Sequence, residues 1–248
     1  MKVSLMKEYS EKIVAKLSQV CENEESNIKK AALLITNAIL NKKHIYIFGC
    51  THSSILAEEV FYRAGSLAEY EPLFAPGLSV TNAKPVLTSL MERNEQFGRD
   101  IVSCSRLEKG DILVIISTSG KNAVPVEVAL RAKDLGVRLV VITSIAYREF
   151  PSNHSSGKKL LDTEPDVIID NHVDPGDATM EIAGNLMGPI STILGAFILH
   201  SISMEIAEEL VKKGIEPNVF TSANIPQGMG KNEKILQNDF FKRILMMP

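Results

Sequence analysis

Features that mark several large classes of protein are scarce in this sequence. Its three cysteines, Cys21, Cys50 and Cys104, are widely separated and form neither a zinc-type nor a redox pair. No basic stripe points to nucleic acid, because 27 lysines and arginines stand against 30 acidic residues and the net charge is −3. No group of metal ligands has a diagnostic spacing either. We therefore predict no obligatory metal, no cofactor and no nucleic-acid partner.

Long apolar runs are also missing. No stretch approaches the roughly 20 consecutive apolar residues that a membrane-spanning helix needs. The first eight residues are amphipathic and lack the apolar core of a signal peptide. We therefore expect a cytoplasmic protein that does not bind a membrane. The length of 248 residues suits one α/β domain with extra helices, and no change of composition marks a boundary within residues 1–248.

One segment combines a buried-strand pattern with a run of hydroxyl groups. Residues 112–116 are all apolar and mostly β-branched, which is typical of a parallel strand covered on both faces. Ser-Thr-Ser-Gly follows at 117–120, and Asn122 is a candidate N-cap for a helix that Gly136 would end. Hydroxyls and helix N-terminal amides that point at one spot favour an anion. The segment therefore predicts a phosphate site that needs no arginine.

The same arrangement occurs once more upstream. Residues 44–48 lead into Gly-Cys-Thr-His-Ser-Ser at 49–54 and then into helical sequence over 55–62. Neighbouring parallel strands end at one edge of a sheet, so the two loops would share one crevice. For either loop alone, a polar turn that only caps a helix is the alternative, but the pair favours a phosphate. The predicted phosphate ligands are Ser53, Ser54, Ser117, Thr118, Ser119, Gly120 and Asn122.

These two loops resemble those of the SIS (sugar isomerase) family of phosphosugar-binding domains, over roughly residues 28–230. Ser-Thr-Ser-Gly-Lys-Asn is similar to the family's second serine loop and Gly-Cys-Thr-His-Ser to its first. The first loop of the family usually reads Gly-x-Gly-x-Ser, so Ser53 falls on the phosphate-contacting serine and Thr51 replaces the second glycine. The resemblance implies a three-layer αβα fold around a flavodoxin-like five-stranded parallel sheet. Family members include aldose–ketose isomerases, an etherase and non-catalytic regulators, so the fold does not settle the activity.

The remaining pattern supplies the other elements of such a fold. Apolar residues at three-and-four spacing predict two helices in an N-terminal extension over residues 1–42. These helices are expected at 3–21 and 28–40, a long helix at 191–213, and further strands at 68–74, 136–143 and 166–170.

Two polar stretches have no clear element pattern. Residues 144–165 would form a lid or a wall of the site, with a disordered surface loop as the alternative. The C-terminal tail covers 215–248, and its residues 220–224 could return to the site.

Isomerisation of a sugar phosphate moves a proton between adjacent carbons through an enediolate, so it needs a general base. His52, Glu58 and Glu59 are the candidates beside the first loop, and the two glutamates cannot share one helix face. The resemblance favours Glu59, because it stands six residues after Ser53, where sedoheptulose-7-phosphate isomerases carry a metal-binding histidine. The alternatives are solvated glutamates near a helix start and a histidine that only caps the turn.

Other catalytic branches of the family match less well. The glutamate that precedes Ala-Ser-Thr-Lys in glucosamine-6-phosphate synthase is replaced by Leu186, and Asn224 stands near the histidine of arabinose-5-phosphate isomerases. Glu181 and Asn185, one helical turn apart, are further candidates, with capping or exposure as the alternative. Three other histidines are not expected in the site. His154 and His172 are expected on the surface, and His200 in the core.

The sequence thus predicts a phosphosugar-binding SIS domain that isomerises a sugar phosphate without a metal and forms a homodimer or a larger homo-oligomer. A non-catalytic phosphosugar-sensing regulator and a sugar-phosphate lyase or etherase are the alternatives. The lack of a helix-turn-helix domain weighs against a transcription regulator.

Overall fold

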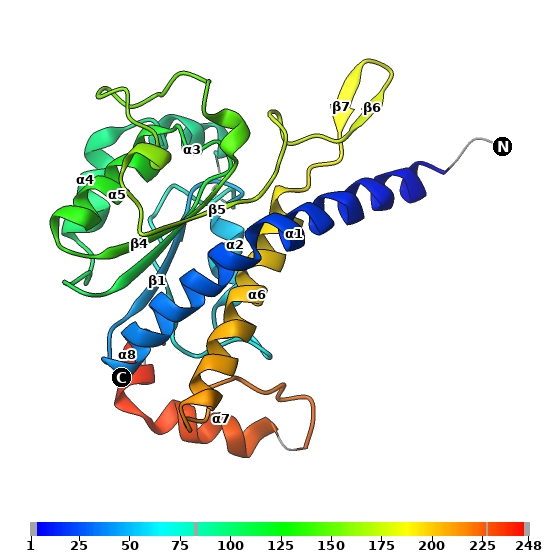
Figure 1. Ribbon diagram of the computed structural model, residues 1–248. Helices are drawn as coiled ribbons and strands as arrows, with labels where there is room; N and C mark the ends of the chain where they lie inside the picture. Colours follow the sequence, from blue (N-terminus) through cyan, green and yellow to red (C-terminus); the bar gives the residue numbers. More distant parts are fainter. Residues whose placement is uncertain (1–3, 82–83, 227, 246–248) are drawn as a thin grey trace.

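The computed structural model describes residues 4–81, 84–226 and 228–245 (Figure 1). Within these ranges, five parallel strands form one sheet in the order β2-β1-β3-β4-β5. The strands are β1 (Ile45–Gly49), β2 (Tyr70–Pro72), β3 (Ile112–Ile116), β4 (Arg138–Thr143) and β5 (Val167–Asp170). The expected α/β fold with a five-stranded parallel sheet is confirmed.

Helices cover both faces of this sheet. The α-helices that the described residues form are α1 (Leu5–Leu40), α2 (Ser54–Val60), α3 (Pro85–Met91), α4 (Glu95–Ser103), α5 (Ala123–Asp134), α6 (Ser191–Lys212), α7 (Gly228–Gln237) and α8 (Asp239–Ile244). One face carries α1, α2 and α6, and the other carries α4 and α5. No helix among the described residues is long and apolar enough to cross a membrane.

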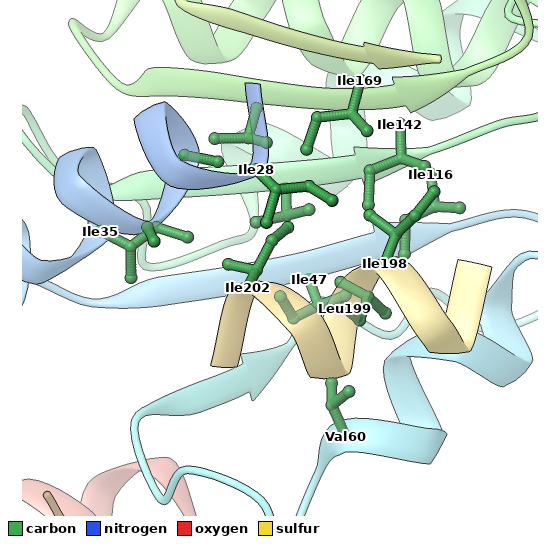
Figure 2. Packing of buried hydrophobic residues seen from close by; sticks show 14 of the residues in the cluster. Ile28, Ile35, Ile47, Val60, Ile116, Ile142, Ile169, Ile198, Leu199 and Ile202 are labelled. Carbon is green, nitrogen blue, oxygen red and sulfur yellow. The ribbon is translucent and has the colours of Figure 1, made fainter. Parts of the chain in front are cut away.

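Successive residues of β1, β3 and β4 pack alternately into two separate hydrophobic cores, one on each face of the sheet. Ile47, Ile116 and Ile142 point to the face that α1 and α6 cover (Figure 2). Their strand neighbours Phe48 and Ile115 point to the opposite face and pack with α4 and α5. Because both faces are buried, the strands read as continuous apolar runs rather than alternating patterns. Each such side chain stabilises the fold by about 1.5–3 kcal/mol relative to an exposed position.

The N-terminal extension differs from its prediction, because α1 is one continuous helix of 36 residues instead of two. The polar residues at 22–27 contain no proline or glycine that would end a helix. Ser4 caps the start by accepting a hydrogen bond from Lys7 N at 3.2 Å. Polar residues therefore continue the helix, and its buried face runs through them at Glu24, between Val20 and Ile28.

Residues 180–187 also differ from the prediction, since they form a β-hairpin of β6 (Met180–Ile182) and β7 (Asn185–Met187). Glu181 and Asn185 therefore lie on opposite strands instead of one helical turn apart. Ala183 and Gly184 both have positive φ, of 51° and 79°, as a tight two-residue hairpin turn requires. Figure 1 shows this hairpin extending beyond the sheet, as the first half of α1 also does.

The C-terminal tail closes the opposite edge of the sheet. Phe220 exchanges backbone hydrogen bonds with Gly65 and Ser66, just ahead of β2. Phe241 and Ile244 of α8 pack with it in a small third core. The Phe220 ring lies 5.1 Å from the Tyr62 ring, two residues after α2, and the expectation that residues 220–224 return to the site stays a prediction. Residues 227 and 246–248 of the tail lie outside the described ranges.

Candidate functional site

The two predicted loops lie at the same edge of the sheet. Strands β1 and β3 are direct neighbours, and Gly49 pairs with Ile116 at their carboxyl ends. The chain then leaves β1 through residues 50–54, here named the first serine loop, and leaves β3 through residues 117–122, the second serine loop. The fold therefore brings together the two loops that the sequence analysis singled out.

Hydrogen bonds within the protein fix the second serine loop from several sides. Ser117 Oγ accepts from Gly120 N at 3.3 Å, which closes the loop on itself. The Thr118 carbonyl accepts a hydrogen bond from Ser144 N at 2.9 Å, and the Thr118 side-chain Oγ1 accepts one from Asn171 Nδ2 at 3.3 Å. Asn171 follows β5 and was missed, although the rule that parallel strands end at one edge would have placed it here.

Gly120 has a structural reason to be glycine. Its φ of 59° lies in the left-handed region, and a Cβ there would come within 2.6 Å of Thr143 Oγ1. Gly120 also accepts, through its carbonyl, a hydrogen bond from Leu160 N at 2.8 Å. Residues 144–165 are therefore an ordered segment packed against the second serine loop and not a disordered surface loop, and their role as a lid or a wall of the site stays a prediction.

Neighbouring residues form hydrogen bonds with some of the polar groups at the start of α5. Asn122 occupies the N-cap position without capping the helix through its side chain; its Oδ1 accepts from Asn153 Nδ2 at 2.6 Å. Val124 N donates to the Glu92 carbonyl at 3.0 Å. Burial raises the pKa of the Glu92 carboxyl, although a hydrogen bond with Asn122 and the Arg93 charge oppose this. The Ser119 hydroxyl, by contrast, is half-buried and has no hydrogen-bond partner within the described part of the chain.

The first serine loop has a strained backbone. Thr51 has a φ of 54°, which a β-branched residue rarely adopts and which glycine adopts freely. The Thr51 amide donates to the Leu78 carbonyl at 2.7 Å, and Thr51 forms a parallel bridge with Ser79. At Gly49, a Cβ would lie only 2.4 Å from the Ser53 carbonyl oxygen. Gly49, the last residue of β1, is therefore needed for close approach to Ser53, and the position taken by Thr51 also suits a glycine.

The two serines of this loop differ in availability. Ser54 Oγ donates to the Thr51 carbonyl at 2.7 Å and is buried. Ser53 is half-buried, and its hydroxyl forms no hydrogen bond with any residue that the structure describes. His52 is exposed. Ser53 is thus the counterpart, in the first loop, of Ser119 in the second.

A cleft of about 560 Å³ opens beside the first serine loop. Ser54, Glu58 and Phe61 line one side, and residues 74–79 with Thr81 line the other. This volume lies in the range of small-molecule sites. The segment at 74–81 was missed as a wall, because its place depends on the bridge to Thr51 and on no local motif.

Glu58 and Glu59 point in different directions, as their helix spacing predicts. Glu58 is exposed and lines the cleft. Glu59 Oε1 instead accepts from Arg63 Nη1 at 2.6 Å and lies 3.2 Å from His200 Nε2. His200 is half-buried on α6 and is not the core histidine that was expected. Of the two carboxylates, only Glu58 lines the cleft.

Two further histidines were expected on the surface and are more buried than that. His172 is half-buried, has a strained φ of 53° and lies 3.5 Å from Glu24 Oε1. His154 is buried, and its Nε2 lies 2.7 Å from Glu127 Oε2. His154 has its acidic partner 27 residues earlier in the chain, and His172 has one distant partner, Glu24, beside the nearby Asp170 at 3.5 Å.

One group of potential metal ligands occurs among the described residues, formed by Glu95, Glu127 and His154 with donor atoms within 4.8 Å of one another. Glu127 already accepts hydrogen bonds from Arg99 at 2.8 Å and from Arg131 at 2.7 Å. The two guanidinium groups supply the positive charge that a metal would otherwise bring.

Known proteins match this chain in sequence and in fold. A family model described as SIS domain matches residues 8–144. A UPF0309 protein of Shouchella clausii is 38% identical over 95% of this chain and 96% of its own length. A UPF0309 protein of Oceanobacillus iheyensis shows the same identity and coverage.

Among solved structures, a phosphoheptose isomerase from Francisella tularensis matches with a TM-score of 0.55 at 16% identity, over 84% of this chain and all of that one. A phosphoheptose isomerase from Neisseria gonorrhoeae gives a TM-score of 0.54 at 16% identity, over 82% of this chain and 97% of that one. At such identities the likeness shows a shared fold.

Proposed function

This chain belongs to the SIS domain family, and from that premise we propose that it binds the phosphate group of a sugar phosphate between its two serine loops. The observation that carries the proposal is the pair Ser53 and Ser119. Each lies in one loop, at the same sheet edge, with a hydroxyl that no described residue engages. Hydroxyls and backbone amides suffice for this ligand, because a hydrogen bond to a charged oxygen contributes on the order of 1.5–3 kcal/mol.

We further propose that the cleft holds the sugar and that the chemistry is an aldose–ketose isomerisation. A base removes the proton from the carbon next to the carbonyl, and the enediolate is then protonated on the neighbouring carbon. Glu58 lines the cleft, whereas Glu59 is engaged by Arg63 and His200, so Glu58 is the better base. His52 is exposed beside the phosphate serine and can assist ring opening. The proposed reaction needs no metal.

Calorimetry tests the binding proposal directly. A sugar phosphate should bind, and the same sugar without phosphate should bind barely at all. A thermal-shift screen finds the sugar first, since a ligand at about one hundred times its Kd adds roughly 2.7 kcal/mol of stability. Equal affinity for the sugar and its phosphate would refute phosphate recognition. Tight binding without proton exchange at any sugar carbon would instead assign a phosphosugar sensor.

We also propose that the protein forms at least a homodimer. Leu186 and Met187 on the hairpin are 66% and 54% exposed, and Met6 on α1 is 80% exposed. These apolar side chains lie on the two elements that extend beyond the sheet, which fits an interface between copies. Light scattering at micromolar concentration should give at least twice the 27.2 kDa of one chain. A single-chain mass would contradict the proposal.

A further inference from the structure

A buried histidine lies in the polar segment between β4 and β5. His154 is only 7% exposed, although the residues on either side of it are exposed. Both ring nitrogens have partners: Nε2 lies 2.7 Å from Glu127 Oε2, and Nδ1 lies 2.8 Å from Ser156 Oγ. The ring is therefore fixed in position and in orientation.

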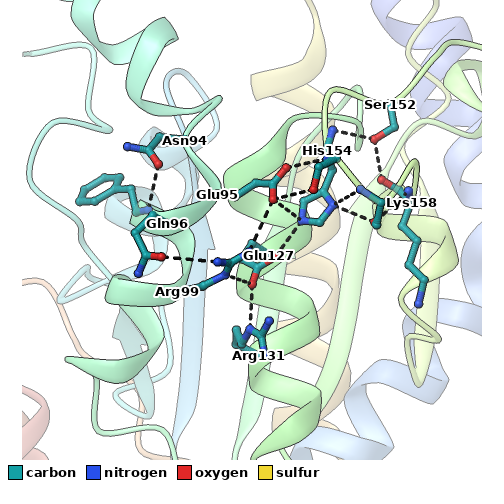
Figure 3. Close-up of polar contacts among 12 residues, drawn as sticks. Asn94, Glu95, Gln96, Arg99, Glu127, Arg131, Ser152, His154 and Lys158 are labelled. Atoms are coloured by element: carbon teal, nitrogen blue, oxygen red, sulfur yellow. Dashed lines mark hydrogen bonds and ion pairs between the residues drawn. The ribbon is translucent and has the colours of Figure 1, made fainter.

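Glu127, whose carboxylate is hydrogen-bonded to His154, is itself held in place by two arginines. Glu127 is 1% exposed on α5, and Figure 3 shows Arg99 and Arg131 meeting it from the side opposite to the histidine. Burial by itself raises the pKa of Glu127, but hydrogen bonds from Arg99, Arg131 and His154 lower it to about 2. Glu127 thus remains charged at neutral pH and serves as a rigid anchor.

A second acidic residue holds the same turn. Glu95 at the start of α4 accepts from Ser155 N at 2.6 Å and from Ser155 Oγ at 2.9 Å. Residues 152–156, here named the clamp turn, are therefore attached to both α4 and α5. The two arginines already neutralise Glu127, so the cluster works as an anchor without a metal.

The clamp turn also contacts the second serine loop through Asn153, the residue before His154. Asn153 N donates to the Lys121 carbonyl at 2.9 Å, and Asn153 Nδ2 donates to Asn122 Oδ1 at 2.6 Å. Asn153 is exposed and has no core packing of its own that would hold it there. The residues after it, His154 bonded to Glu127 and Ser155 bonded to Glu95, hold it in place, and His154 is the buried one of the two.

We propose that His154 is a positioning residue for phosphate binding: it anchors the clamp turn so that Asn153 holds the second serine loop in its binding conformation. This role rests on the proposed function of that loop. Without the anchor, the loop would adopt its binding conformation for a smaller fraction of the time. The apparent Kd rises by the inverse of that fraction, so a population of about one tenth gives a tenfold loss of affinity.

The chain offers a matched control at the opposite edge of the sheet. His44 is also 7% exposed, and its Nδ1 lies 3.2 Å from the buried Glu71. His154→Ala and His44→Ala should both lower Tm. Only His154→Ala should weaken binding of inorganic phosphate, by about tenfold in a ³¹P NMR titration. His154→Gln, which can still donate to Glu127, should recover most of the affinity.

Two results would overturn the role of His154: wild-type affinity in His154→Ala, or an equal loss in His44→Ala. A double variant sharpens the test, because His154 acts through Asn153. Asn153→Ala with His154→Ala should bind phosphate no more weakly than His154→Ala alone, and additive losses would contradict the coupling.

Hydrogen exchange separates this role from the proposed function. The backbone amides of residues 119–123 should exchange faster in His154→Ala than in His44→Ala, with no ligand present. Wild-type protein that binds no phosphate refutes the proposed function, and the exchange rates still decide whether His154 holds the loop. Unchanged exchange in His154→Ala would show that it does not.

Discussion

The two serine loops leave adjacent strands yet are held in different ways. The second loop is bonded to two later segments: residues 144–165, through Ser144 and Asn153, and the turn after β5, through Asn171. The first loop is bonded to itself and to residues 78–79, and it leaves His52 exposed. A loop fixed from several sides is suited to constant recognition of one group, such as a phosphate. An open loop beside a cleft is suited to the part of the site where chemistry and specificity vary.

The largest expected effect tests whether the helix that follows the open loop carries the catalytic base. Glu58→Gln should lower turnover by about 10²–10⁴-fold, because it removes a positioned base, while sugar-phosphate affinity changes only a few-fold. Incorporation of solvent deuterium at the carbon next to the carbonyl measures this step. Glu59→Gln is the matched control, since its carboxylate pairs with Arg63 and His200. A larger loss in Glu59→Gln would restore Glu59 as the base.

Two buried carboxylates differ in a similar way, because one has charged partners and the other has none among the described residues. Glu127, near the second loop, is paired with two arginines. Glu69, at the amino end of β2, accepts a side-chain hydrogen bond from Asn218, and its Oε2 has no hydrogen-bond partner among the described residues. Burial raises the pKa of Glu69 from 4.5 to about 6, against the opposing hydrogen bond from Asn218.

The sign of the resulting pH dependence follows from that raised pKa. The stability that protonated Glu69 contributes is fully present below pH 4.5 and is lost as the pH rises through about 6. Glu69→Gln cannot ionise and should unfold with a free energy higher by up to about 2 kcal/mol at pH 8. Urea unfolding at pH 8 and pH 4.5 measures the difference. An advantage that persists at pH 4.5 would contradict the assignment to ionisation.

The strands and the two serine loops could be predicted from the sequence, whereas the burial of individual side chains such as His154 could not. The strands and both loops were found because burial on two faces demands continuous apolar runs, and the turns after β1 and β3 carry their own glycines and hydroxyls. His154 was misplaced, because only Glu127, 27 residues earlier in the chain, makes its burial possible.

The choice between Glu58 and Glu59 shows the same limit. Helix spacing predicts that the two carboxylates diverge, but which one meets the cleft depends on where α6 places His200. The continuity of α1 was missed for a related reason. A polar stretch such as residues 22–27 ends a helix only if it contains a residue that breaks the backbone pattern.

A smaller effect compares the free serine of each loop. Ser119→Ala should weaken sugar-phosphate binding about tenfold, because it removes one hydrogen bond to a charged oxygen from a loop that cannot rearrange. Ser53→Ala should cost less, since the open loop can let water replace the hydroxyl. Calorimetry with the same ligand measures both. Equal losses would show that the two loops recognise the phosphate alike, and Ser54→Ala, which loses a bond within the loop, is the control for folding.

The smallest expected effect concerns the strain in the first loop. Thr51 holds a φ of 54°, whereas the residue in left-handed conformation in the second loop, at φ 59°, is Gly120. Thr51→Gly should relieve about 1–2 kcal/mol of backbone strain, offset by about 0.5–1 kcal/mol from the greater freedom of glycine in the unfolded chain. A net gain between about 0 and 1.5 kcal/mol is therefore expected in urea unfolding. Gly120→Ala should do the opposite and destabilise, because its Cβ would meet Thr143 Oγ1. If Thr51→Gly stabilises the fold but lowers turnover, the strain is part of the catalytic geometry of the open loop. If it destabilises the fold, the contrast between a strained and a relaxed loop does not hold.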